Sequence, residues 1–159
     1  MNWMSRRIFA AALALAAVGL ASAARSQGNA PETDAGATLF VSHGAPWLLG
    51  IELYQHQPIF YDLGSLVFQT ATEGGTYDAS AWQSVIAECR FAGGKLTDMT
   101  LTPLQLNAEG IDGDLATRGR PSLAQSADAA AILDRLDTSS APFGTKISRT
   151  GDTALIRPS

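Results

Sequence analysis

The residue best placed for metal-assisted hydrolysis is His43, which follows a short apolar run of β-prone residues, Leu39–Val41. The cluster Ser42–Pro46 forms turns readily, so we expect His43 to lie in a loop at the end of a strand. A hydrolytic metal site needs several nitrogen or oxygen ligands that converge on one or two cations, and an imidazole at a strand end suits that role. One imidazole does not hold a metal, so the residues alone leave His43 open as a ligand or as a bystander.

The other polar residues near His43 add little to such a site. Glu52 and Asp62 are the carboxylates nearest to it in sequence, and either could orient a metal-bound imidazole by accepting its hydrogen bond. The alternative, which we adopt for both, is a solvated carboxylate on a sheet face. His56 is interpreted as an exposed turn residue. Ser42 is not predicted to be a nucleophile, because triad members meet in space rather than in sequence and no Gly-x-Ser-x-Gly motif is present.

A first β-hairpin is predicted to follow the histidine loop. Ile51–Tyr54 alternates apolar and polar side chains, and Gln55–Pro58 reverses the chain into Ile59–Tyr61. The break at Asp62–Ser65 contains a glycine and predicts a turn, after which Leu66–Phe68 is expected to form another short strand.

The second predicted hairpin spans Ser84–Leu106, with a glycine turn in the middle and with Met99 and Leu101 on one face. Pro103 lacks a backbone N–H, which predicts that the returning strand lies at a sheet edge or carries a bulge. Cys89 shares its face with apolar residues and is interpreted as a small core hydrophobe. As the chain's single cysteine, it cannot form an intramolecular disulfide.

One amphipathic helix is predicted after residue 125. Ser126 is a suitable N-cap, and the helix should end near Thr138–Ser140. The apolar residues recur at i, i+3, i+4 and i+7 and are Ala129, Ile132, Leu133 and Leu136. Gly151–Asp152 predicts a small terminal hairpin of marginal independent stability. These elements together predict a β-rich α+β fold with hairpins and one helix.

Two further features are interpreted as structural. Trp82 is expected to pack as an amphipathic anchor rather than bind a ligand. Asp112 and Asp114 could suggest a calcium loop, but the twelve-residue ligand pattern with its closing glutamate is absent. We therefore interpret both aspartates as part of a solvated loop.

The central stretch resembles the CapA family of capsule and poly-γ-glutamate biosynthesis proteins, whose members are similar to calcineurin-type metallophosphatases. The resemblance covers residues 39–147 and is most specific between Gly50 and Gly64. The matching segments are Ser42–Pro46, Gly50-Ile51-Glu52, Tyr54–Tyr61 and Leu63-Gly64-Ser65-Leu66, with looser matches at Glu88–Phe91, Leu101–Leu104, Arg118–Pro121 and Ser140–Thr145.

The resemblance implies the C-terminal portion of a calcineurin-like metallophosphatase sandwich, with His43 at a metal-ligand position and manganese or a similar divalent cation as cofactor. This sequence departs from the family where a second loop histidine falls on Pro46 and where an asparagine falls on Ser65. The family's further ligands belong to an earlier half-domain, and we expect no room for it before Leu39. The implied metal site is therefore incomplete, and the implied partner is a missing half-domain or another copy of the chain.

The N-terminus is typical of an exported protein. Residues 1–23 have a basic start, an apolar run of about 13 residues and a small-residue cleavage site at Ala21–Ala23, which predict a signal peptide rather than a membrane span. Ser5–Phe9 also resembles the twin-arginine signal, the alternative being two arginines that merely supply positive charge. We expect a linker at 24–38, the partial domain at 39–147 and a tail at 148–159.

The predicted mature chain is acidic. Cleavage takes Arg6 and Arg7 from the 11 basic side chains and leaves nine against 15 acidic ones, a formal charge of −6. This charge disfavours nucleic acid and anionic membranes as partners. The expected function is thus that of a periplasmic or secreted CapA-like protein of capsule or poly-γ-glutamate biosynthesis, truncated and of uncertain enzymatic activity. The alternatives are a non-enzymatic periplasmic interaction module and a non-functional gene remnant.

Overall fold

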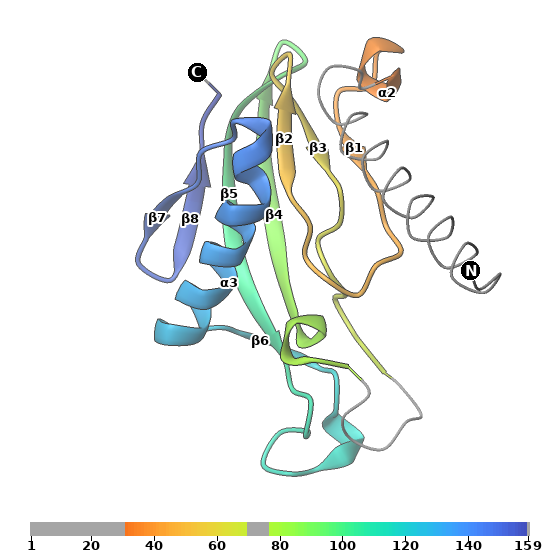
Figure 1. Ribbon diagram of the computed structural model, residues 1–159, viewed down its shortest axis with the longest axis vertical. Helices are drawn as coiled ribbons and strands as arrows, with labels where there is room; N and C mark the ends of the chain where they lie inside the picture. The colour runs from red at the N-terminus through yellow and green to blue at the C-terminus, as the bar shows by residue number, and fades with distance from the viewer. Residues whose placement is uncertain (1–30, 70–76, 159) are drawn as a thin grey trace, which may run out of the picture.

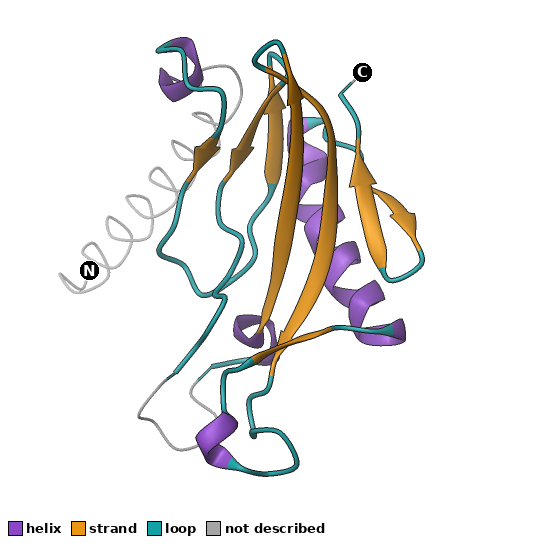
Figure 2. Ribbon diagram, turned by 180° about the vertical axis from the view of Figure 1, so that it is seen from behind, coloured by secondary structure: helices purple, strands orange, loops and turns teal. Residues whose placement is uncertain are grey.

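The computed structural model describes residues 31–69 and 77–158 and confirms a β-rich α+β fold (Figure 1). Two sheets lie beside one longer helix, α3 (Ser126–Ser140), and the view from behind shows the larger sheet in front of that helix (Figure 2). The predicted signal peptide lies outside the described residues. Among those that are described, none of the helices has the length and apolar character of a membrane span.

The smaller sheet confirms the first predicted hairpin. It consists of β1 (Phe40–Val41), β2 (Ile51–Tyr54) and β3 (Gln57–Phe60) in the order β1-β3-β2, with β1 parallel and β2 antiparallel to β3. Gln55 and His56 form the hairpin turn with φ of 51° and 65°, the left-handed conformations that a tight hairpin of right-handed twist requires. The sheet thus places β1, and the loop after it, beside the end of β3.

The prediction of a strand at Leu66–Phe68 is wrong. Leu66 and Val67 lie in a bend and are 61% and 58% exposed. A strand needs a ladder of backbone hydrogen bonds to a neighbour, and the described contacts of this segment include one such bond, from the N–H of Phe68 to the carbonyl of Gly119 (3.2 Å). The apolar run therefore follows the surface instead of joining a sheet.

The larger sheet contains the second predicted hairpin, β4 (Gln83–Ala92) and β5 (Lys95–Leu106), joined by a turn at Gly93–Gly94. Its order is β4-β5-β8-β7, with β7 (Ser148–Thr150), β8 (Thr153–Ile156) and a short β6 (Pro121–Leu123) that pairs with β5. The terminal hairpin is therefore confirmed, and its strand β8 continues the same sheet.

The returning strand β5 is not an edge strand, because it has neighbours on both sides. It does carry the predicted irregularity, but away from Pro103: Arg90 pairs with Asp98 and Phe91 with Leu96, so Thr97 is an extra residue in β5. On the side away from β4, β8 pairs with residues 99–101 and β6 with residues 104–106. The carbonyl of Pro103 points to that side, where it accepts the N–H of Ala124 (3.0 Å). A residue's N–H and C=O point the same way in a strand, so the proline nitrogen falls in the gap between two partner strands.

The main core lies between α3 and both sheets. Ala129, Ile132, Leu133 and Leu136 are each at most 1% exposed, which confirms the predicted apolar face of the helix. They pack with residues of both sheets, which include Ile51, Phe60, Val85, Met99, Leu101 and Ile156. Since β8 contributes two of its four residues to this core, the terminal hairpin is stabilised by the whole domain rather than by itself.

The start of α3 differs from the prediction in one detail. Gln125 occupies the N-cap position and makes no side-chain capping bond, and Ser126 has a positive φ of 51°. The N–H of Ser126 instead donates to Oδ1 of Asp152 in the β7–β8 turn (3.0 Å). A carboxylate from the terminal hairpin thus supplies the capping that we expected from Ser126.

A second, smaller core surrounds Trp82 at the end of the molecule opposite to the β2–β3 and β4–β5 turns (Figure 1). The 3₁₀ helix η1 (Ala79–Trp82) leads into β4, and Trp82 is 5% exposed and packs with Ala81, Leu106 and Phe68. The guanidinium of Arg118 lies 5.0 Å above the indole ring. The structure thus confirms Trp82 as a packing anchor.

Three short helical segments complete the chain. The 3₁₀ helix η2 (Leu115–Thr117) lies in the acidic loop, where Asp112 and Asp114 are exposed as predicted, and η3 (Ala141–Phe143) follows α3. The helical turn α2 (Pro31–Asp34) lies in the predicted linker. Oδ1 of Asp34 accepts the hydroxyl of Tyr54 (3.1 Å), so this part of the linker contacts the β2–β3 hairpin.

Candidate functional site

The loop that carries His43 is held in place by the buried side chain of Asp62. Asp62 follows β3, is 2% exposed, and accepts the backbone N–H groups of Gly44 (2.9 Å) and Ala45 (2.8 Å) on Oδ2. Its Oδ1 accepts the N–H of Gly64 (3.0 Å), two residues later. Our interpretation of Asp62 as a solvated carboxylate is therefore wrong. The side chain turns inward because three backbone donors replace the water that it loses.

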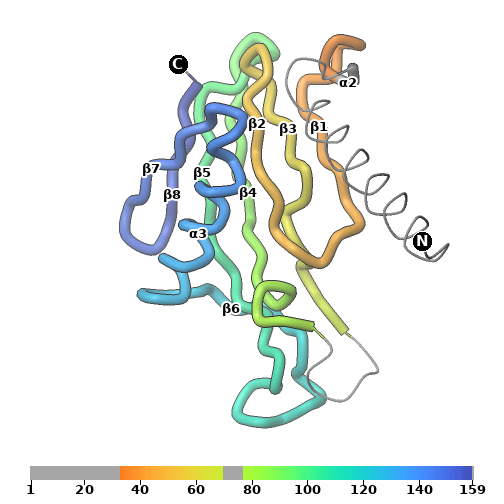
Figure 3. Tube along the Cα trace, in the orientation of Figure 1, coloured from red at the N-terminus to blue at the C-terminus, as the bar shows by residue number. Residues whose placement is uncertain are grey.

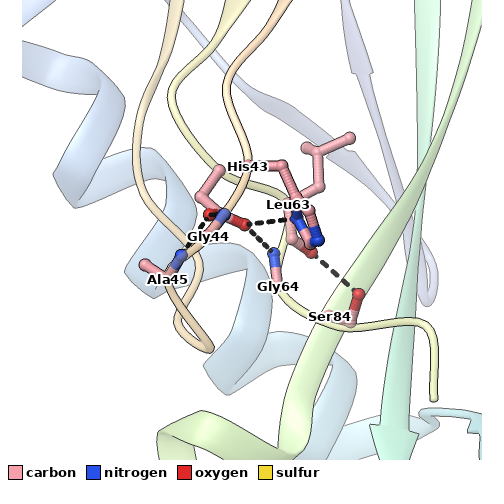
Figure 4. A network of polar contacts seen from close by, with 7 residues as sticks. His43, Gly44, Ala45, Leu63, Gly64 and Ser84 are labelled. Atoms are coloured by element: carbon pink, nitrogen blue, oxygen red, sulfur yellow. Dashed lines mark hydrogen bonds and ion pairs between the residues drawn. The ribbon is translucent and has the colours of Figure 1, made fainter. Parts of the chain in front are cut away.

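His43 lies above this anchor at the strand end, as predicted. Its side chain is 77% exposed, and Nδ1 lies 4.0 Å from Oδ1 of Asp62, too far for a direct hydrogen bond. Figure 4 shows the imidazole in the same small network as Gly44, Ala45 and Gly64. The buried carboxylate fixes the backbone of the loop, and Nδ1 of the exposed imidazole is directed toward it.

The chain after Asp62 ties this loop to the larger sheet. The carbonyl of Leu63 accepts the hydroxyl of Ser84 in β4 (2.8 Å; Figure 4). It also accepts the N–H of the next residue in that strand, Val85 (3.3 Å). Gly64 has φ of +73°, and a Cβ there would lie 2.7 Å from the carbonyl oxygen of Gln83. Glycine is needed here both for the left-handed backbone and for the close approach of β4.

The described residues do not complete a metal site around His43. No group of three or more histidine, cysteine, aspartate or glutamate side chains in residues 31–69 and 77–158 is arranged to hold a cation. Both oxygens of Asp62 already accept backbone N–H groups, which makes this carboxyl an anchor rather than a further ligand. The residues present therefore supply one imidazole, and we derive no metal-dependent step from them.

The segments around Gly50, Tyr61 and Ser140 form a structural junction next to this loop. A Cβ on Gly50 would lie 2.3 Å from the carbonyl oxygen of Ser139, so glycine lets the chain touch the end of α3. The N–H of Ile51 donates to Oγ of the buried Ser140 (3.0 Å). Tyr61 stacks on Phe143 with ring centroids 4.9 Å apart. The spacing of these segments is thus explained by packing between β2 and the helix end.

The remaining candidate residues lie apart from His43. The hydroxyl of Tyr61 donates to Oε2 of Glu52 (2.6 Å), so Glu52 is half-buried and bonded rather than fully solvated. His56 is exposed in the β2–β3 turn, as predicted. Cys89 is half-buried and packs against the main core, and its burial raises the pKa of the thiol.

Sequence reasoning missed two features of the site. The first is the anchoring role of Asp62, for which Asp62-Leu63-Gly64 was a signal, because an aspartate often accepts the N–H of the residue two positions later. The second is a pocket at the other end of the β2–β3 hairpin, which includes Lys146 and Arg157. The residues on either side of the predicted terminal hairpin could have suggested that these two cations lie close together.

The chain has relatives of unknown role among known proteins. The uncharacterized proteins y4sH and y4uA of Sinorhizobium fredii are each 33% identical to it over an alignment of 162 positions, which covers 78% of this chain and 34% of each relative. The chain thus spans about a third of the length of the curated relatives it matches. No protein-family profile matches the sequence.

Proposed function

We propose that this chain is the closing portion of a CapA-like, calcineurin-type metallophosphatase sandwich and acts in capsule or poly-γ-glutamate biosynthesis in the periplasm or outside the cell. The observation that carries the proposal is the position of His43, which lies exposed at the end of β1 above a loop held by the buried Asp62. An anchored loop that presents an imidazole to solvent at a strand end is what a ligand position requires.

In this proposal His43 is one ligand of a site for manganese or a similar divalent cation, and another polypeptide or another copy supplies the other ligands. The relatives are about three times the length of the matched region, which supports the idea that the matched region works with further structure. The chain alone should show little or no phosphoesterase activity, because one imidazole does not hold a dinuclear centre.

The deciding experiment is complementation in the producing cell. Deletion of the gene should reduce the amount of capsular polymer or polyglutamate, and the wild-type gene should restore it. His43→Ala should not restore it, whereas Glu109→Ala, which truncates an exposed side chain in the acidic loop, should. Unchanged polymer in the deletion strain would exclude the biosynthetic role. Full restoration by His43→Ala would exclude the ligand role alone.

A second candidate function, a non-enzymatic interaction module, is favoured by the surface around β1. Four large apolar side chains between residues 39 and 49 are 40–50% exposed: Leu39, Val41, Trp47 and Leu49. Among the described strands, β1 has a neighbour on one side, β3, which leaves its other edge open. An open edge next to exposed apolar side chains is typical of a surface that pairs with another chain.

This candidate predicts self-association or binding of a separate half-domain through β1. Val41→Lys should shift the chain to the monomer in light scattering, because it puts a charge on the open edge strand. Leu115→Lys is the matched control, since Leu115 is 69% exposed in the acidic loop, and it should leave the association unchanged. A wild-type chain that is strictly monomeric and binds no hydrophobic dye would exclude the module. A chain that shows no cooperative unfolding would instead support the gene remnant.

A further inference from the structure

A pocket of about 320 Å³ lies at the end of the molecule formed by the β2–β3 turn, the segment after η3 and the chain beyond β8. The trace in Figure 3 brings these three segments together where α3 ends and the C-terminus lies. Leu53 and Phe143 give the pocket apolar walls, while His56, Thr145, Lys146 and Arg157 give it polar ones. Its volume is at the lower end of the range for small-molecule sites.

The charge of this pocket is opposite to that of the protein. The whole chain has a formal charge of −4, but Lys146 and Arg157 line the pocket and no aspartate or glutamate does. Asp137, which accepts the N–H of Ile147 (3.4 Å), is not among the lining residues. A concave site lined by one sign of charge attracts ions of the other sign.

Lys146 and Arg157 lie on either side of the terminal hairpin. Lys146 comes two residues before β7 and Arg157 directly follows β8, and both line the pocket. Two like charges that share a small pocket repel each other. Arg149, nearby, has an ion pair with Asp134 (2.9 Å), whereas within residues 31–69 and 77–158 no carboxylate lies within ion-pair distance of Lys146 or Arg157.

An independent feature of the pocket is the hydroxyl of Thr145. Thr145 is 5% exposed and lines the pocket, and its Oγ1 is buried without a hydrogen-bond partner in the described part of the chain. Buried hydroxyl groups are nearly always paired, so an unpaired one in a pocket that two cations also line indicates a missing acceptor. An anion would provide an acceptor for the hydroxyl and countercharge for both cations.

We propose that this pocket binds a small organic anion through a carboxylate or phosphate group. Lys146 and Arg157 contact the charged oxygens, Thr145 donates its hydroxyl, and Phe143 and Leu53 cover the apolar part of the ligand. Arginine and lysine both bind such oxyanions, and arginine can do so with two parallel hydrogen bonds. The site does not involve His43 and is independent of the proposed metal role.

The test is calorimetric titration of the folded chain at low salt with inorganic phosphate and with glutarate, which separate phosphate from carboxylate ligands. Uncharged glutaramide is the ligand control. Binding of either anion should weaken at least about tenfold in Lys146→Gln/Arg157→Gln. Arg90→Gln/Arg120→Gln removes the same number of charges from exposed positions outside the pocket and should bind like the wild type.

Thr145→Val separates ligand binding from folding. It has nearly the same shape as threonine and removes a hydroxyl without a partner, so the thermal midpoint of the free protein should stay the same or rise. Anion binding should nevertheless weaken by about tenfold, since the donor is lost. Failure of both anions to bind the wild type, binding equal to that of glutaramide, or binding unchanged in the double variant would each overturn the proposal.

Discussion

Asp62 and Ala45, which lie 17 residues apart, are joined by a hydrogen bond of 2.8 Å from the backbone N–H of Ala45 to Oδ2 of Asp62. The same oxygen accepts the N–H of Gly44, and the other accepts that of Gly64. One buried carboxyl group therefore sets the conformation of the loop that presents His43. The order of this loop depends on a residue that does not itself reach the surface.

Asp62→Ala should destabilise the fold by about 2–4 kcal/mol, because it leaves three backbone N–H groups without their acceptor. Asp62→Asn should also destabilise it, since one carboxyl oxygen is replaced by a donor. Urea unfolding measures both effects. Asp112→Asn makes the same change at an exposed position and should stay within about 0.5 kcal/mol of the wild type. An Asp62→Ala variant as stable as that control would show that the anchor contributes nothing.

The need for glycine at residue 64 is tested by a matched pair of substitutions. Gly64 and Gly94 have nearly equal φ values of +73° and +77°, but a Cβ on Gly64 would lie 2.7 Å from the carbonyl of Gln83, whereas one on Gly94 meets nothing within 4 Å. Gly94→Ala should cost only the backbone strain, about 1 kcal/mol. Gly64→Ala should cost clearly more in the same unfolding assay. Equal losses of unfolding free energy in the two variants would mean that β4 moves away from a Cβ at residue 64 at no cost.

The sequence predicted the elements correctly where a local pattern of apolar and polar residues is compatible with only one secondary structure. The alternation of Ile51–Tyr54 and of β4 and β5, the glycine turn between the latter, and the four apolar residues of α3 all depend on burial of one face. Each of these elements is present in the structure. The exposed turn at His56 follows from the same local logic.

The wrong predictions concern relationships that a local pattern does not contain. Pro103 lies in an interior strand because two other strands leave a gap beside it, which requires the positions of β6 and β8. Asp62 is buried because the backbone of residues 44 and 45 comes back to it. Leu66–Phe68 has the composition of a strand, but the only described backbone bond of this segment to a distant residue is to Gly119. In each case the local structure depends on a contact with residues that are distant in sequence.

The contribution of α3 to the core can be measured at Leu136, which is fully buried between the helix and the sheets. Leu136→Ala should lower the free energy of unfolding by about 2–5 kcal/mol, through lost burial and the cavity left behind. Leu115→Ala removes the same atoms from a side chain that is 69% exposed and should change it by less than about 0.5 kcal/mol. Comparable losses in the two variants would contradict the position of the core.

Cys89 connects burial to the pH dependence of stability. It lies on β4 opposite Met99 and packs against the main core, and its burial raises the pKa of the thiol above the ordinary value of 9.0. The native state therefore favours the neutral thiol. The contribution of the neutral thiol to the free energy of unfolding is fully present at pH values below the pKa of the unfolded state. It is lost as the pH rises through the pKa of the native state.

Two measurements check this prediction. At a pH near 9.0, iodoacetamide should modify Cys89 more slowly in the folded chain than in urea, because less thiolate and less access are available. Between neutral and alkaline pH, the wild type should lose more unfolding free energy than Cys89→Ala, which lacks the titrating group. The comparison between the two cancels the titration of lysines and tyrosines. If both chains lose the same amount, the thiol titrates alike in the folded and unfolded states, and Cys89 is then no more than a small packing residue.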